Sequence, residues 1–170
     1  QECVNIFSMK RRTFIALIAT SPVFLRINMQ AKEIPTHAWK TIASVQDTLL
    51  PKTEHMPSAQ DINALFYLVS NCSSEYFDAN DLDFLIKGAS MFHQNFPDFS
   101  HKDTESKNKI LETATKSDFL EKWLSKLIYY TIEAMFSDPI YGGNTHELGW
   151  TSTLHTTGNP RPINKYGRKI

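Results

Sequence analysis

Residues 117–136 read SDFLEKWLSKLIYYTIEAMF, and this stretch does most to decide the fold. Its apolar residues recur at intervals of three and four, which is the period of an amphipathic helix. Ser117 or Asp118 is suited to cap the start of that helix. Residues 127–132 alone could form a strand, but they lie inside the longer helical period. The side of the helix that faces the core is expected to carry Phe119, Trp123, Leu127, Ile128, Met135 and Phe136.

Two helices with start and stop signals are expected earlier in the chain. Thr36 can cap a helix over residues 37–50, which Pro51 ends. Ser58 can cap the next one, because Asp61 follows at the spacing of a capping box. Apolar residues at the helical period follow this second cap: Ile62, Leu65, Phe66 and Val69.

Two more helices complete the predicted bundle. The first begins at Asp78 or Asn80 and ends before Pro97, and the second is an exposed, charged helix over residues 102–116. We therefore predict an all-α fold, a single small bundle of about five helices over residues 31–136.

The composition changes sharply at Ser137. Five of the six glycines lie between residues 142 and 167, and prolines stand among them, so a long helix cannot persist. Residues 137–170 are expected to form an irregular Gly/Pro-rich C-terminal arm. Within it, Pro139 should bias Asp138 toward extended geometry.

Four further residues of the arm have specific expected roles. The pair Gly142-Gly143 permits positive φ or a close backbone approach, and Asn144 can hydrogen-bond a local turn. Trp150, beside Gly149, suits an interface hot spot and a packed tail equally well.

The N-terminal region has the features of an export signal. Lys10, Arg11 and Arg12 precede an apolar run, residues 14–25, that is too short to span a bilayer and fits a secretory signal. An ordinary signal or a short N-terminal helix is the alternative. Paired arginines with Phe14 two positions later resemble the twin-arginine address. We expect a signal over residues 9–30, and residues 1–8 to be upstream translation or a cloning remnant.

The remaining chain lacks the patterns of several function classes. Without residues 1–30 it has 14 Lys and Arg against 17 Asp and Glu, a mildly acidic balance that argues against nucleic-acid binding. Nucleotide-binding, metalloprotease and hydrolase motifs are missing from the sequence, so no catalytic, cofactor-binding or metal-binding residue is predicted. Cys72, downstream of the expected start, should be a buried, unreactive thiol. An enzyme would have to use Asp138, His146 and Glu147.

The string Phe136-x-Asp138-Pro139-x-Tyr141-Gly142-Gly143-Asn144 is followed by Gly149-Trp150 and Gly158-x-Pro160. Together with the paired arginines and the Trp39 to Pro51 helix pattern, it resembles the gluconate 2-dehydrogenase subunit 3 family. The resemblance extends over nearly all of the chain after the signal.

The resemblance implies a periplasmic, non-catalytic subunit with no cofactor of its own. In the family, the partners are a large FAD-dependent (GMC-type) dehydrogenase subunit and a multihaem cytochrome c subunit that carries haem c. The small subunit would escort the large one through the twin-arginine translocase, assist its maturation, and reach the membrane only through partners. The motif residues would then mark a partner interface: Asp138, Pro139, Tyr141, Gly142, Gly143, Asn144, Gly149 and Trp150.

Two alternatives from other classes stay open on the residues alone. One is a free-standing periplasmic enzyme that uses the arm as its site. The other is a free-standing structural or binding protein of the same fold, without an oxidoreductase partner.

Overall fold

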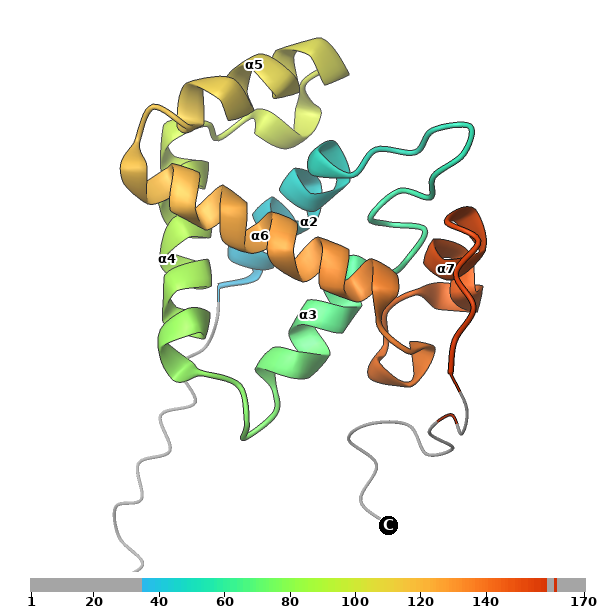
Figure 1. The fold of residues 1–170 in the computed structure, drawn as a ribbon. Coiled ribbons are helices and arrows are strands. Elements are labelled where there is room, and N and C mark those ends of the chain that lie inside the picture. Colours follow the sequence, from blue (N-terminus) through green and yellow to red (C-terminus); the bar gives the residue numbers. More distant parts are fainter. Residues whose placement is uncertain (1–34, 159–160, 162–170) are drawn as a thin grey trace, which may run out of the picture. The chain divides into compact units, whose positions relative to one another are not determined.

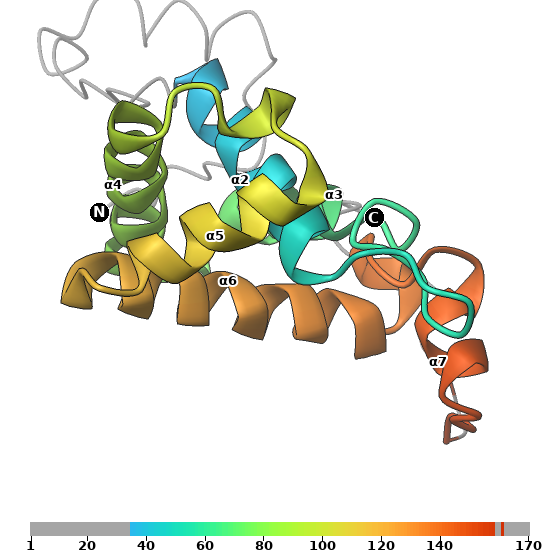
Figure 2. The same ribbon diagram turned by 90° about the horizontal axis from the view of Figure 1, so that it is seen from above.

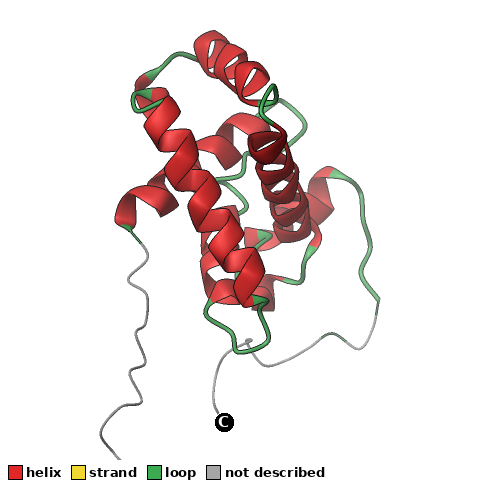
Figure 3. Cartoon of the chain, turned by 90° about the vertical axis from the view of Figure 1, so that its left-hand side faces the viewer, coloured by secondary structure: helices red, strands yellow, loops and turns green. Residues whose placement is uncertain are grey.

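The computed structural model describes residues 35–158 and Arg161. The expected signal, with Arg11, Arg12 and Phe14, lies outside these residues. The described part consists of helices and loops, and no strand occurs in it (Figure 3). The predicted all-α fold is therefore confirmed.

Six α-helices and three short 3₁₀-helices make up the described part of the chain (Figure 1). The α-helices are α2 (Thr36–Leu49), α3 (Ala64–Cys72), α4 (Ala79–Asn95), α5 (Thr104–Ala114), α6 (Asp118–Phe136) and α7 (Leu148–Ser152). The 3₁₀-helices are η3 (Phe99–His101), η4 (Pro139–Tyr141) and η5 (Thr145–Glu147).

Helix α2 lies at the centre and contacts α3, α4, α5 and α6. Its residues Ala38, Ile42 and Val45 are completely buried, which is the pattern of a helix with an apolar stripe. Figure 2 shows α6 along one side of the bundle, with α4 near its start and α7 near its end. The long helix α6 thus connects the main core to the C-terminal arm.

Trp123 is the largest of the completely buried side chains in the described part of the chain, and it packs between α4 and α6. It is fully buried, and its Nε1 donates a hydrogen bond to the Leu85 carbonyl at 3.0 Å. Its ring lies 5.4 Å from that of Phe92. A Cβ on Gly88 would fall 2.1 Å from Trp123 Cδ1, so the two helices can approach this closely only because residue 88 has no side chain.

Two helix starts differ from the sequence prediction. Helix α2 includes Thr36, which makes no capping bond. Ser58 and Asp61 do form the predicted reciprocal bonds, with Asp61 N–H donating to Ser58 Oγ and Ser58 N–H to Asp61 Oδ2, both at 3.1 Å. These bonds close a turn, however, and Asn63 is left-handed with φ 62°, so α3 begins only at Ala64.

The other caps agree better with the prediction. Asp78 accepts a hydrogen bond from the Asn80 N–H at 2.8 Å and starts α4. Helix α5 is largely exposed, as predicted, and its cap is Asp103.

The predicted core side of α6 is wrong at two positions. Ile128 and Phe136 are 46% and 43% exposed, whereas Leu120, Leu124 and Tyr130 are buried. Helix α6 carries apolar residues on both sides, so the period alone could not choose the side that faces the core.

Cys72 is half-buried at the end of α3, and it is a free thiol. Burial, and then the charge of Asp81, raise the pKa of its thiol to about 12. The thiol therefore stays protonated at neutral pH, which agrees with the predicted lack of reactivity. None of the helices in the described part of the chain has the length and hydropathy needed to cross a bilayer.

Candidate functional site

The arm folds back onto the carboxyl end of α6. It contains η4, η5 and the five-residue α7, short helical segments that the sequence analysis did not predict. Pro139 opens η4, and left-handed Gly142, with φ 95°, ends it. Asp138 is extended, as predicted. Non-glycine residues with positive φ then turn the chain between the segments: Asn144, His146, Glu147 and Leu154.

Asn144 is the side chain that joins the arm to α6. It is completely buried, its Nδ2 donates to the Ser137 carbonyl at 3.0 Å, and its Oδ1 accepts from the Gly149 N–H at 2.8 Å. Its φ of 45° lies in the left-handed region, which asparagine tolerates better than most residues. One side chain thereby satisfies two backbone groups that would otherwise be unpaired.

The motif glycines allow backbones to pack against each other. A Cβ on Gly143 would lie 2.6 Å from the Ala134 carbonyl oxygen, and one on Gly149 would lie 2.1 Å from the Met135 carbonyl oxygen. Gly142 is needed both for its positive φ and because a Cβ there would lie 2.8 Å from the Phe66 ring. These contacts explain three of the motif residues by packing within the chain.

Trp150 is also used inside the chain. It is only 6% exposed, and its Nε1 donates to the Phe136 carbonyl at 2.9 Å. The last carbonyls of a helix have no partner within it, and here Trp150 and Asn144 supply partners from the arm. The geometry of Trp150 therefore favours the packed-tail interpretation over an exposed hot spot.

Arg161 binds the two acidic residues that an enzymatic site would have needed. Its Nη1 donates to Glu147 Oε1 at 2.7 Å and its Nε to Asp138 Oδ2 at 3.3 Å, and these carboxylates, Glu147 first, raise the pKa of Arg161. The guanidinium lies 5.0 Å from the centre of the Trp150 ring. His146 is exposed and left-handed. Asp138 also caps η4 through the Ile140 N–H.

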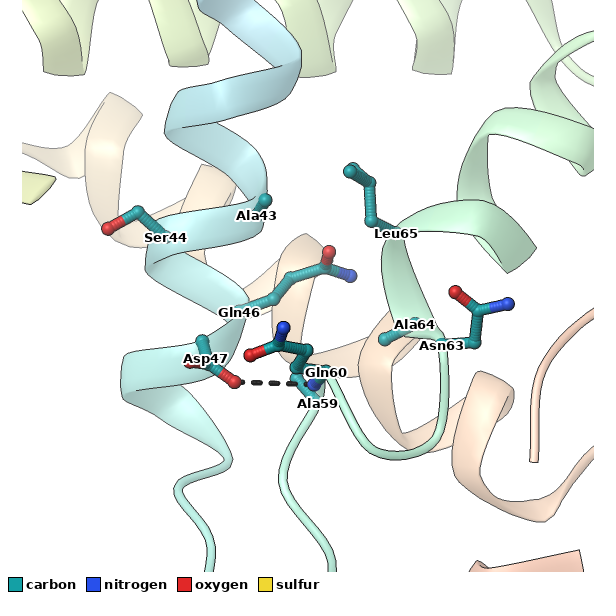
Figure 4. A pocket seen from close by; sticks show the side chains of 9 residues that line it. All are labelled: Ala43, Ser44, Gln46, Asp47, Ala59, Gln60, Asn63, Ala64 and Leu65. Carbon is teal, nitrogen blue, oxygen red and sulfur yellow. Dashed lines mark hydrogen bonds between the residues drawn. The ribbon is translucent and has the colours of Figure 1, made fainter. Parts of the chain in front are cut away.

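A pocket of about 390 Å³ lies between α2 and α3 (Figure 4). Gln46 is 1% exposed and donates through Nε2 to Thr131 Oγ1 at 3.1 Å, while its Oε1 has no hydrogen-bond partner within the described residues. Asp47 accepts from the Gln60 N–H at 3.2 Å. A bound water would satisfy the Gln46 oxygen, so these residues are accounted for without a catalytic role.

A second pocket, of about 370 Å³, lies where the loop after α3 meets α4 and α6. We call it the tyrosine pocket, and its main residues are Tyr67, Tyr76, Asp81, Lys126, Tyr129, Tyr130 and Glu133. Asp81 Oδ2 accepts from Lys126 Nζ at 2.8 Å and from Tyr130 Oη at 2.9 Å, and the Lys126 bond is the main reason that the pKa of Asp81 is lowered. Burial, followed by the carboxylate of Glu133, raises the pKa of Tyr67 well above its ordinary value.

The second half of α6 exposes a group of large apolar side chains. This apolar face consists of Ile128, Tyr129, Ile132 and Phe136, which are 46%, 59%, 44% and 43% exposed. Contiguous exposed apolar residues often mark surfaces that bind another protein.

The tyrosine pocket was not predicted from the sequence. Lys126, Tyr129, Tyr130 and Glu133 follow one another at helical spacing (i, i+3, i+4, i+7), so they share one side of α6. This spacing is the only local signal for the pocket, and it does not show that the loop after α3 and the start of α4 complete it.

No group of three or more His, Cys, Asp or Glu residues in the described part of the chain could hold a metal ion. The motif residues Asn144 and Trp150 and the motif glycines pack the arm, whereas the apolar face lies on α6.

A sequence profile of the family described as gluconate 2-dehydrogenase subunit 3 matches residues 36–155. The chain therefore belongs to this family, and the resemblance seen in the sequence is confirmed. No curated protein and no solved structure matches the chain significantly.

Proposed function

We propose that this chain is the non-catalytic small subunit of a periplasmic FAD-dependent sugar or polyol dehydrogenase complex. The family match over residues 36–155 is the observation that carries the proposal. The structure adds support, because Asp138 and Glu147 are both bound to Arg161 and the apolar face of α6 suits a protein partner.

In this proposal the redox chemistry belongs to other chains. FAD is bound by a GMC-type large subunit, and haem c by a cytochrome c subunit that passes electrons to the respiratory chain. A flavoprotein folds around its cofactor in the cytoplasm, so it needs an exporter of folded proteins. The paired arginines of this chain would supply the address for both subunits, and the chain would reach the membrane only through its partners.

Affinity purification of the tagged chain from the periplasmic fraction tests the complex. We expect a large subunit, identified by mass, together with a flavin absorption spectrum. Dye-linked sugar oxidation by the isolated chain, with nothing else bound, would instead support a free-standing enzyme.

The escort role has a separate test. The double variant Arg11→Lys and Arg12→Lys should retain both this chain and the large subunit in the cytoplasm, because the translocase reads the pair as an address. Cell fractionation measures this, and Arg26→Lys, outside the pair, is the matched control. Export of the large subunit with the double variant would contradict the escort role.

A binding protein of the same fold without an oxidoreductase partner is the second candidate, since the apolar face of α6 would serve any protein partner. A neighbouring reading frame for a large flavoprotein without its own signal would favour the first proposal. Purified complexes that contain a partner but no flavin would favour the second.

A further inference from the structure

We propose that the apolar face of α6 and the tyrosine pocket beside it bind the flavoprotein large subunit, through a segment that presents apolar side chains and one Arg or Lys side chain. This inference rests on the proposed function, because it names the surface through which the small subunit would hold its partner.

The first observation is that the exposed apolar residues of α6 are clustered on one side of its second half. Ile128, Tyr129, Ile132 and Phe136 fall within an arc of about 100° around the helix, at 100° per residue. The first half of α6 presents polar residues on the same exposed side: Asp118, Glu121, Lys122 and Ser125. The exposed side therefore changes from polar to apolar halfway along one helix. Core packing does not require this change, because the core uses the opposite side of α6.

The second step is that the apolar face runs into the tyrosine pocket. Tyr129 belongs to both, and its ring lies 5.3 Å from that of Tyr130 in an edge-on arrangement. Tyr76 borders the same pocket and is 85% exposed. A partner segment that covers the apolar face would thus also place a side chain at the pocket.

The charges of the tyrosine pocket determine which kind of partner side chain it can bind. Asp78, Asp81 and Glu133 line it against one cation, Lys126, which is already bound to Asp81. Carboxylates beside exposed aromatic rings favour a cationic group, which can make charge-assisted hydrogen bonds and cation–π contacts. A guanidinium or ammonium group complements this pocket, and an anion would be repelled.

The apolar contacts are tested with the tagged full chain and the large subunit that it purifies with. Ile128→Glu and Ile132→Glu should each raise the dissociation constant at least about tenfold, because a charge replaces a buried apolar contact. Both residues are about half exposed in the free chain, so the melting temperature should change little. Met91→Glu, on α4 and 37% exposed, is the matched control and should bind like the wild type.

The pocket is tested by charge. Glu133→Lys should weaken binding more than Glu133→Gln, because a cation then faces a cation. Tyr76→Ala should weaken it as well, and this exposed residue carries the test if Glu133→Lys unfolds the chain. Tighter binding by Glu133→Lys would overturn the assignment of a cationic group. If Glu133→Lys unfolds the chain, unchanged binding by Tyr76→Ala would overturn it.

The outcomes separate this inference from the proposed function. A wild-type chain that purifies with no flavoprotein would overturn both. A wild-type complex that survives Ile128→Glu and Ile132→Glu unchanged would overturn only the surface proposed here. A dimer of this chain that Ile132→Glu dissociates, measured by light scattering, would show that a second copy occupies the face and would also overturn the inference.

Discussion

Replacing Asn144 with alanine removes the side chain that joins the end of α6 to the start of α7. Two backbone groups lose their partners, the Gly149 N–H, which is buried, and the Ser137 carbonyl, which is partly buried. Alanine must also adopt the left-handed conformation at this position, where φ is 45°. All three effects destabilise the folded arm.

The size of the effect follows from these three terms. An unpaired buried backbone group costs about 1–3 kcal/mol, with the partly buried carbonyl at the lower end. Left-handed geometry costs alanine about 1–2 kcal/mol. We therefore expect the free energy of unfolding to fall by about 4 kcal/mol, which lowers the melting temperature by roughly 12 °C for a domain of this size.

Thermal unfolding followed by far-ultraviolet circular dichroism measures the change, and two variants separate its causes. Asn144→Gly accepts the left-handed conformation but loses both bonds, so it should keep about 2–3 kcal/mol of the destabilisation. Asn63→Ala changes an exposed left-handed asparagine that makes no capping bond, and it should cost only about 1 kcal/mol. If Asn144→Ala is no more damaging than Asn63→Ala, the two hydrogen bonds do not stabilise the arm, contrary to this prediction.

Two further substitutions test the core and the tyrosine pocket. Gly88→Ala should lower the free energy of unfolding by about 2 kcal/mol or more, because the new methyl group meets the Trp123 ring. Denaturant titration measures this, with Gly158→Ala, which enters open space, as the control. Asp81→Asn should destabilise the chain at pH 7. Because Lys126 holds the pKa of Asp81 below 3.8, the advantage of the wild type is fully present above about pH 4 and is lost as the pH falls through the folded pKa. Urea titrations at pH 7 and pH 3 compare the two, and an equal difference at both values would contradict the ion pair as its cause.

Local signals in the sequence were enough to predict the main helices. The helical period, the prolines and the cap at Asp78 predict α2, α4, α5 and α6, since these signals act over a few residues. The start of α3 was missed because the Ser58 capping box has the same sequence whether a helix or a single turn follows it.

The structure of the arm was only partly predictable, because its contacts join residues that are separated in the sequence. The sequence correctly predicts positive φ or close approach at Gly142 and Gly143, because glycine, without a Cβ, permits both at the lowest steric cost. It could not predict which carbonyls Asn144 and Trp150 would reach, since those partners depend on how the arm returns to α6. For the same reason, the sequence could not predict the tyrosine pocket, because it forms only where the loop after α3 meets α4 and α6.

The dependence of α6 on the arm has a consequence for synthesis. The carbonyls at the end of this helix find their partners in residues that the ribosome makes later, up to Trp150, with Arg161 added over the ring. During translation, the last carbonyls of α6 therefore cannot form these hydrogen bonds until that downstream segment has left the exit tunnel. A transcript cut short within the arm would yield a polypeptide whose earlier helices can form. The carboxyl end of its α6, however, would lack its partners and would be exposed to proteases.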